Sequence, residues 1–383
     1  MSEPQVERAQ RVTPLELFFD LVFVFSFTQV TTVLSANPTW SGLGHAFLLL
    51  GVLWWAWSSY AWLTNTVDPD LGAVSAAVLV AMAAMFVAAL AVPDAFGSHG
   101  VLFGVSFLIV AAMHVTLDTL SARHDPNLLA SGLRITAAEL VGAALIVVAG
   151  FVGGGLKTGL WVVALAVAYG APFVTGLPAW RVQPSHFAER HGLIVIVALG
   201  ESLVAIGLGG EVGGLTAKVI LAAVLGFAVT AAFWLAYFDF FTIRAEQLVA
   251  DRSGAERTAL ARDLYTYLHF PMIAGIVLFA FAVETTLAHV DERLATVPAL
   301  ALTWGPALFL FAFVALRFRI SGKARSGRLF ASIACALLWP VATHVPALVA
   351  LTLVAIVWAA LHAYEIIWWH EERAQTRALR APA

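Results

Sequence analysis

Charged residues and cysteine are scarce in this sequence. Asp, Glu, Lys and Arg supply 12% of its 383 residues, whereas a soluble domain typically carries about 25%. Hydrophobic residues supply 61%, so water cannot be the main solvent of the folded chain. The single cysteine, Cys335, lies within an apolar run, which excludes an internal disulfide and a cysteine metal cluster.

Several motifs of cofactor and metal sites are also missing. A Walker loop and an HExxH pair do not occur, and His186, Glu189 and His191 do not fit the related HxxEH spacing. The Gly-rich GLGGEVGG (207–214) follows an apolar helix rather than a strand, so we interpret it as an outer turn and not as a phosphate-binding loop. The basic residues form no nucleic-acid patch, and the net charge is -3. We therefore expect no cofactor, no bound metal and no nucleic-acid partner.

Long apolar runs recur along the whole chain. A helix needs about 20 apolar residues to cross the hydrocarbon core of a bilayer. Stretches such as 73–92 are apolar on every side, whereas the strands of a membrane β-barrel alternate in polarity. We predict an all-α, polytopic transmembrane bundle of twelve spans, at 15–36, 42–64, 71–92, 99–120, 131–152, 156–176, 189–210, 215–241, 264–288, 299–316, 328–344 and 346–369.

The basic residues predict the orientation of these spans, because cytoplasmic loops carry the excess of Lys and Arg. With both termini inside, the cytoplasmic face holds 18 of the 21 basic residues: Arg8, Arg11, Arg123, Arg134, Arg181, Arg190, Arg244, Arg252, Arg257, Arg262, Arg317, Arg319, Lys323, Arg325, Arg328, Arg373, Arg377 and Arg380. The other face holds Lys157, Lys218 and Arg293. The sequence thus predicts a multi-pass protein of the bacterial inner (cytoplasmic) membrane, with the lipid bilayer as its partner.

The chain reads as one membrane domain, 1–383, in which two halves of six spans are similar. ELFFDLVFVFSFTQV (16–30) aligns with ERHGLIVIVALGESL (189–203). The matched residues are Glu16 with Glu189, Trp57 with Trp234 and Tyr60 with Tyr237. Because six is even, halves 1–175 and 176–383 would run in the same direction, as in transporters with parallel repeats. Chance similarity among apolar helices is the alternative, and both interpretations stay open.

Three segments carry a family resemblance. RVTPLELFFDLVFVFSFTQVT (11–31), ERHGLIVIVALGESLVAIG (189–207) and YTYLHFPMIAGIVLFAFAVE (265–284) resemble the bacterial low temperature requirement A family. The family name records a growth phenotype in the cold. The resemblance implies an integral membrane protein without an established reaction, and it supplies no catalytic residues.

Ionisable side chains inside the predicted spans are the candidate functional residues. Such groups are costly at bilayer depth and usually face a bundle interior or a water-filled path. The candidates for a proton or substrate pathway are Glu201, Asp20, Glu16, Glu189, Asp118, His114, Glu139 and Asp239. The structural alternative is that these acids form ion pairs with Arg134, Arg190 or Arg317 and only hold the bundle together.

Some of these candidates are spaced along the sequence so that they share a helix face. Glu16 and Asp20 are four residues apart and share a helix face, as do His114 and Asp118. The latter pair supplies two ligands from one face, which is too few for a metal site. Glu201 lies about 18 Å along its span at 1.5 Å per residue, too deep to reach the headgroups.

Three functions remain open. The first is a secondary transporter or channel that carries an unidentified small molecule or ion and uses buried carboxylates for proton coupling. The second is a membrane-embedded enzyme acting on lipid, and the third is a non-catalytic cold-stress sensor or assembly factor. We favour the first, and therefore a protein that is not an enzyme, because twelve spans, internal similarity and mid-membrane acids occur together. The sequence predicts no particular oligomeric state.

Overall fold

The computed structural model describes residues 12–175, 182–322 and 326–368. Their elements are α1 (Pro14–Ala36), α2 (Trp40–Thr64), α3 (Gly72–Ala91), η1 (Val92–Asp94), α4 (Gly100–Ala122), α5 (Pro126–Gly150), α6 (Gly154–Val174), α7 (Pro184–Gly213), α8 (Ala217–Ala236), η2 (Tyr237–Phe241), α9 (Thr242–Ala250), α10 (Gly254–Ala261), η3 (Arg262–Tyr267), α11 (His269–Ala288), α12 (Thr296–Ser321), α13 (Gly327–Leu337), α14 (Trp339–Ala342) and α15 (Ala347–Trp368). The predicted all-α bundle is confirmed.

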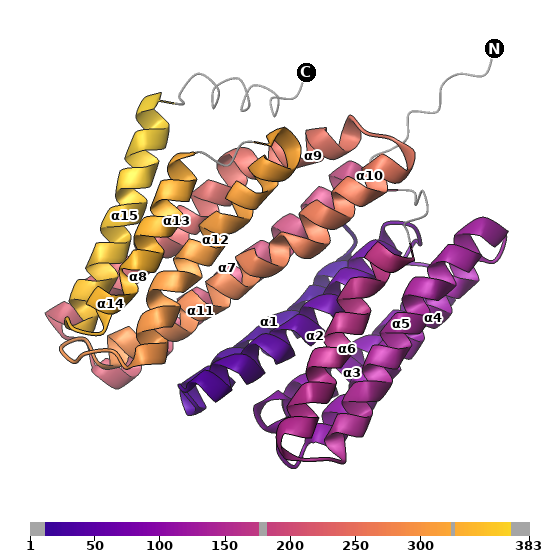
Figure 1. The fold of residues 1–383 in the computed structure, drawn as a ribbon, viewed down its shortest axis with the longest axis horizontal. Helices are drawn as coiled ribbons and strands as arrows, with labels where there is room; N and C mark the ends of the chain where they lie inside the picture. The colour runs from indigo at the N-terminus through magenta and orange to yellow at the C-terminus, as the bar shows by residue number, and fades with distance from the viewer. Residues whose placement is uncertain (1–11, 176–181, 323–325, 369–383) are drawn as a thin grey trace.

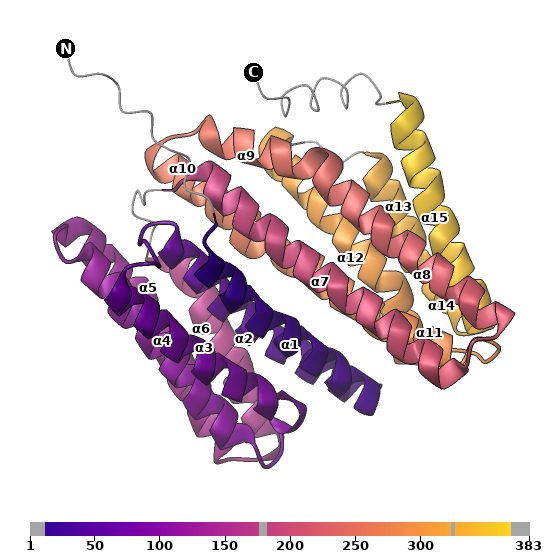
Figure 2. The ribbon, with the colours of Figure 1, turned by 180° about the vertical axis from the view of Figure 1, so that it is seen from behind.

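Eleven of the helical segments in these ranges are long and apolar enough to cross a membrane, and Gly327–Ala342 is a shorter apolar one. Together these twelve segments follow the order of the predicted spans. α1 begins and α15 ends at the same end of the bundle, as the two opposite views show (Figure 1, Figure 2). We call this the terminal end. Because both ends of the described chain lie at the terminal end, the fold agrees with an even number of crossings.

The basic residues follow this division of the bundle. Lys157 and Lys218 begin α6 and α8, and Arg293 joins α11 to α12, all at the end opposite the terminal end. The hairpin of α9 and α10, which carries three of the predicted cytoplasmic arginines, lies at the terminal end. Eight predicted cytoplasmic residues lie outside the described ranges: Arg8, Arg11, Arg181, Lys323, Arg325, Arg373, Arg377 and Arg380.

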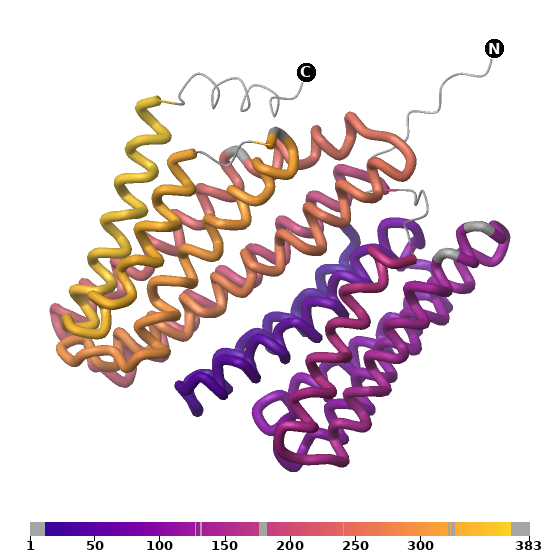
Figure 3. The backbone as a smooth tube through the Cα atoms, viewed as in Figure 1, coloured from indigo at the N-terminus to yellow at the C-terminus, as the bar shows by residue number. Residues whose placement is uncertain are grey.

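Several predicted boundaries need correction. The span predicted at 328–344 is broken into α13 and α14, because Pro340 lacks a backbone N–H and its ring clashes with the preceding helical turn. The spans predicted at 215–241 and 264–288 contain π-helical turns, η2 and η3, through which α8 continues into α9 and α10 into α11. The tube in Figure 3 shows both long helices passing through these turns without a break.

The predicted outer turn at 207–214 is also wrong, because α7 continues to Gly213. A Cβ atom at Gly209 would overlap the carbonyl oxygen of Glu284, and one at Gly213 would overlap that of Leu287. These glycines therefore let α7 and α11 approach closely along this stretch. Their role is helix packing inside the bundle.

Within each half, the helices contact one another in the same order. In the first half, α1 contacts α2 and α3, α3 contacts α4, α4 contacts α5, α5 contacts α6, and α6 contacts α2. In the second half, α7 contacts α8 and α11, α11 contacts α12, α12 contacts α13, α13 contacts α15, and α15 contacts α8. The order of these six contacts is the same in both halves. α1 and α7 join the halves to each other.

Candidate functional site

A group of buried polar side chains lies between α1, α2 and α7 near the terminal end. We call it the charge cluster, and its members are Glu16, Asp20, Trp57, His186 and Arg190. Each of them is no more than 2% exposed. The start of α1 positions the first member, because Thr13 and Glu16 form a capping box in which each side chain accepts a hydrogen bond from the other's backbone N–H.

Arg190 lies between the two carboxylates. Its Nη2 atom is 3.2 Å from Asp20 Oδ1, and its Nε atom is 3.7 Å from Glu16 Oε1. None of its three nitrogens makes an aligned hydrogen bond within the described part of the chain. The guanidinium carbon also lies 5.7 Å from the centre of the Trp57 ring. The arginine is therefore held by charge rather than by directed hydrogen bonds.

His186 is neutral in this arrangement. Gln183 N donates to Asn65 Oδ1 (2.8 Å), which assigns the amide nitrogen of Asn65 to the other side, 3.3 Å from His186 Nδ1. The amide donates, so His186 Nδ1 accepts and the ring proton is on Nε2. His186 Nε2 lies 3.2 Å from Glu16 Oε2, to which it donates. Two carboxylates and a single guanidinium are therefore buried together with a neutral imidazole.

Asp20 is the less satisfied of the two carboxylates. Glu16 Oε2 accepts from Thr13 N at 2.9 Å as well as from His186. Asp20 Oδ1 accepts from Trp57 Nε1 at 2.8 Å, whereas Asp20 Oδ2 has no hydrogen-bond partner among the described residues. The cluster is electrically neutral when one carboxyl group holds a proton. Glu16 Oε1 also has no hydrogen-bond partner among the described residues, but it lies 3.2 Å from His186 Nε2 and 3.7 Å from Arg190 Nε. We therefore place the proton on Asp20 Oδ2.

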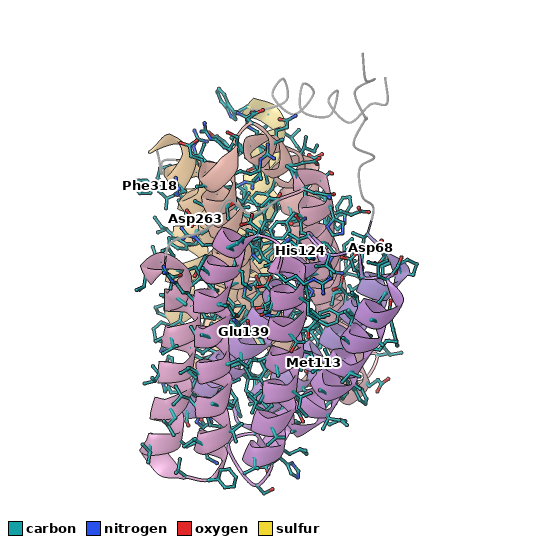
Figure 4. The ribbon with its side chains drawn as sticks, turned by 90° about the vertical axis from the view of Figure 1, so that its right-hand side faces the viewer. Asp68, Met113, His124, Glu139, Asp263 and Phe318 are labelled. Atoms are coloured by element: carbon teal, nitrogen blue, oxygen red, sulfur yellow. The ribbon has the colours of Figure 1, made fainter. Side chains whose placement is uncertain are left out.

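A cavity of about 420 Å³ lies on the other side of α2, between α2, α4, α5, α6 and η3. We call it the α2–α5 cavity. Its mouth carries exposed polar residues, among them His124 and Asp125, and its floor is buried and includes Ser58, His114 and Glu139. His114 Nδ1 lies 2.9 Å from Glu139 Oε2, within hydrogen-bond distance. Figure 4 shows His124 near the terminal end and Glu139 farther along the bundle.

One helix separates the charge cluster from the cavity. On α2, Trp57 bonds to Asp20, whereas Trp55, Ser58 and Trp62 line the cavity. The Tyr60 ring lies 4.8 Å from the Phe19 ring of α1 and 5.5 Å from the His114 ring of α4. A movement of α2 would therefore change the contacts of both the charge cluster and the α2–α5 cavity.

Glu201 contacts α1 at Thr28, farther along that helix than Asp20. It is 2% exposed, and Thr28 Oγ1 of α1 donates to Glu201 Oε2 at 2.6 Å. Further along α1, Ser35 Oγ donates to Glu284 Oε2 of α11 at 3.4 Å. Polar groups thus continue between α1, α7 and α11 beyond the charge cluster.

Two of the predicted residues, Glu189 and Asp239, lie apart from the charge cluster and the α2–α5 cavity. Glu189 is exposed and accepts from Val12 N at 3.3 Å, and Asp239 is half-buried in η2. His114 and Asp118 both line the α2–α5 cavity, as their common helix face predicts. The described residues contain no group of three His, Cys, Asp or Glu side chains that could hold a metal ion.

Three members of the charge cluster are hard to predict from the sequence. In the sequence, His186 fits only an incomplete metal motif, Arg190 is one of several possible ion-pair partners, and Trp57 is matched only with Trp234. An arginine at the start of an apolar span is the signal that identifies the cluster. Its partner acids could not be chosen, because they are 170 residues or more away in the sequence.

This fold defines a polytopic helical membrane protein with ionisable side chains buried between its helices. Residues 11–363 match the family model described as bacterial low temperature requirement A protein, and the chain belongs to that family. An uncharacterized protein of Rhizobium meliloti (strain 1021) is 32% identical over 308 residues, which cover 77% of this chain and 74% of that protein. No solved structure matches the chain.

Proposed function

We propose that this protein is a proton-coupled secondary transporter of the bacterial inner membrane. Asp20 exchanges the proton and the α2–α5 cavity takes the substrate. The observation that carries this proposal is the composition of the charge cluster, in which Arg190 meets both Glu16 and Asp20. Both termini are cytoplasmic in this proposal, so the cavity mouth and the charge cluster lie near the cytoplasmic side.

A buried charge without a counter-charge is unfavourable in a low-dielectric interior. With His186 neutral, one guanidinium balances one carboxylate, and the second carboxylate is balanced by a proton. A structural ion pair needs only one acid. The second acid therefore supports proton exchange over a purely structural role.

The polar groups beyond the cluster extend this proposal to a pathway. Along α1, Asp20 lies about 9 Å from Pro14, Thr28 about 21 Å and Ser35 about 31 Å, at 1.5 Å rise per residue. Thr28 bonds to Glu201 and Ser35 to Glu284. Asp20 of α1, Glu201 of α7 and Glu284 of α11 therefore lie beside α1 at three depths. Proton movement from one end of the bundle to the other requires such a series.

A parallel repeat of halves 1–175 and 176–383 forms the second part of the proposal. The common order of helix contacts in the two halves supports it. Thr28 and Glu201 supply further support, because their separation of 173 residues equals that between the aligned Glu16 and Glu189. Residues equivalent by two-fold symmetry meet where they lie near the axis. In this proposal, the axis runs between α1 and α7.

The test is proton movement in proteoliposomes. Purified protein is reconstituted around a pH-sensitive dye, a pH gradient is imposed, and fractions of a metabolite pool are added outside. We expect at least one fraction to accelerate collapse of the gradient with the wild type, and Asp20→Asn to abolish that acceleration. Glu189→Gln is the matched control, because it neutralises an exposed acid outside the cluster.

Other outcomes would favour the alternatives. Equal acceleration by Asp20→Asn and wild type, at equal reconstitution, would contradict proton exchange at Asp20. Chemical conversion of a pool component without proton movement would favour the membrane enzyme. Neither movement nor conversion would favour the sensor or assembly factor.

A further inference from the structure

The α2–α5 cavity has an excess of acidic groups. Asp118, Asp125 and Glu139 line it, together with His114 and Arg262. Arg262 pairs with Asp263, so even a protonated His114 balances only one of the two carboxylates Asp118 and Glu139. No hydrogen bond or ion pair joins the Asp118 carboxylate to another described residue.

The remaining basic groups of the lining are already engaged. Arg262 donates through Nε (2.8 Å) and Nη2 (2.5 Å) to Asp263 Oδ1, and its guanidinium carbon lies 4.3 Å from the centre of the Phe173 ring. Arg123 Nε donates to His124 Nε2 at 2.9 Å. These groups are therefore poorly placed to attract an anion into the cavity.

Aromatic and polar groups complete the lining. The indoles of Trp55 and Trp62 border the cavity, and aromatic faces attract cations. Trp55 is 6% exposed, and its Nε1 atom has no acceptor among the described residues. The Trp62 indole, by contrast, donates to Thr266 Oγ1 at 2.8 Å. The buried N–H of Trp55 is thus an unused donor beside an acidic cavity.

From these observations we infer that the α2–α5 cavity binds a small organic cation, namely an amine that carries an apolar group. Its volume of about 420 Å³ lies within the range of about 300–1,000 Å³ that is usual for small-molecule sites. The ammonium group meets Asp118 and the Glu139–His114 pair, and the apolar group lies against the tryptophan rings. This inference rests on the proposed function and names the class of its substrate.

A series of three ligands tests the inference without any mutation. Phenethylamine, 2-phenylethanol and phenylacetate have the same ring and a similar length, but at pH 7 the first is a cation, the second is neutral and the third is an anion. Binding to the full-length protein in nanodiscs is measured by calorimetry. We expect phenethylamine to bind at least about tenfold more tightly than 2-phenylethanol, since a charge interaction of about 1.4 kcal/mol gives that factor, and phenylacetate not to bind. Equal binding of the alcohol, or preference for the anion, would overturn the inference.

Two variants then locate the site. Asp118→Asn should weaken phenethylamine binding about tenfold and leave 2-phenylethanol binding unchanged, because only the charge is removed. Asp291→Asn is the control, since Asp291 pairs with Lys218 at the opposite end of the bundle. If Asp118→Asn does not fold, Trp55→Tyr replaces it and should weaken phenethylamine binding at least threefold. Unchanged phenethylamine binding by a folded variant would contradict the site.

Asp20→Asn separates this inference from the proposed function. Asp20 lies on the opposite side of α2 from the cavity, so the variant should bind phenethylamine like the wild type. Amine binding without proton movement in wild-type vesicles would contradict the transporter and leave the cation site standing. Proton-coupled movement of a non-cationic pool component, with no amine binding, would contradict the cation site alone.

Discussion

Arg190 Nη2 of α7 lies 3.2 Å from Asp20 Oδ1 of α1, and both side chains are fully or almost fully buried. This contact joins the first helix of one half to the first helix of the other. Arg190 also approaches Glu16, so it is the single cation shared by two acids. The stability of the α1–α7 interface and its protonation are therefore linked.

The first prediction concerns this link. Arg190→Met leaves two buried acids without a counter-charge and should reduce the stability of the folded protein by about 3 kcal/mol or more. Asp20→Asn should cost much less, because Asn keeps the hydrogen bond from Trp57. The double variant should be more stable than the sum of the two single effects predicts. Thermal unfolding in detergent of all four proteins measures this; simple additivity would mean that the two residues do not interact.

The second prediction concerns the glycines of α7. Gly209→Val should reduce stability by about 1–3 kcal/mol, because its side chain meets the backbone of Glu284 and α11 cannot move away without losing other contacts. Gly200→Ala is the control, since its Cβ meets no atom within 4 Å. We expect that variant to unfold at or slightly above the wild-type temperature. Equal unfolding temperatures for Gly209→Val and wild type would show that α7 and α11 are not in close contact.

The third prediction concerns topology. Reporter fusions after residue 323 and after residue 383 should both report a cytoplasmic location, because the 18 to 3 division of basic residues puts both on the inner face. The pair tests α13 and α14, which together are shorter than the other spans. Opposite locations for the two fusions would mean that α13 and α14 do not cross the membrane together.

The sequence predicts the spans and the helix faces because both depend on local patterns. Apolar length defines the spans, and a spacing of four puts Glu16 beside Asp20 and His114 beside Asp118. The pairing of Arg190 with the two acids of α1 depends on which helices pack together, which no local pattern encodes. For the same reason, the α2–α5 cavity could not be predicted. The role of the glycines of 207–214 cannot be decided from the sequence, because a turn and a close helix contact both favour glycine.

The last prediction concerns Glu201, which lies midway along α7 and bonds to Thr28 at 2.6 Å. Gln at this position keeps the shape and can accept the same hydrogen bond, so Glu201→Gln should insert and unfold like the wild type. It removes the titratable group between Asp20 and Glu284, so we expect loss of pH-driven flux and of growth complementation in the cold. Thr28→Val is the companion variant, because it removes the hydrogen bond and keeps the acid; we expect it to retain flux at a reduced rate. Flux and complementation at wild-type levels in Glu201→Gln, with equal expression, would remove Glu201 from the pathway and end it at Asp20.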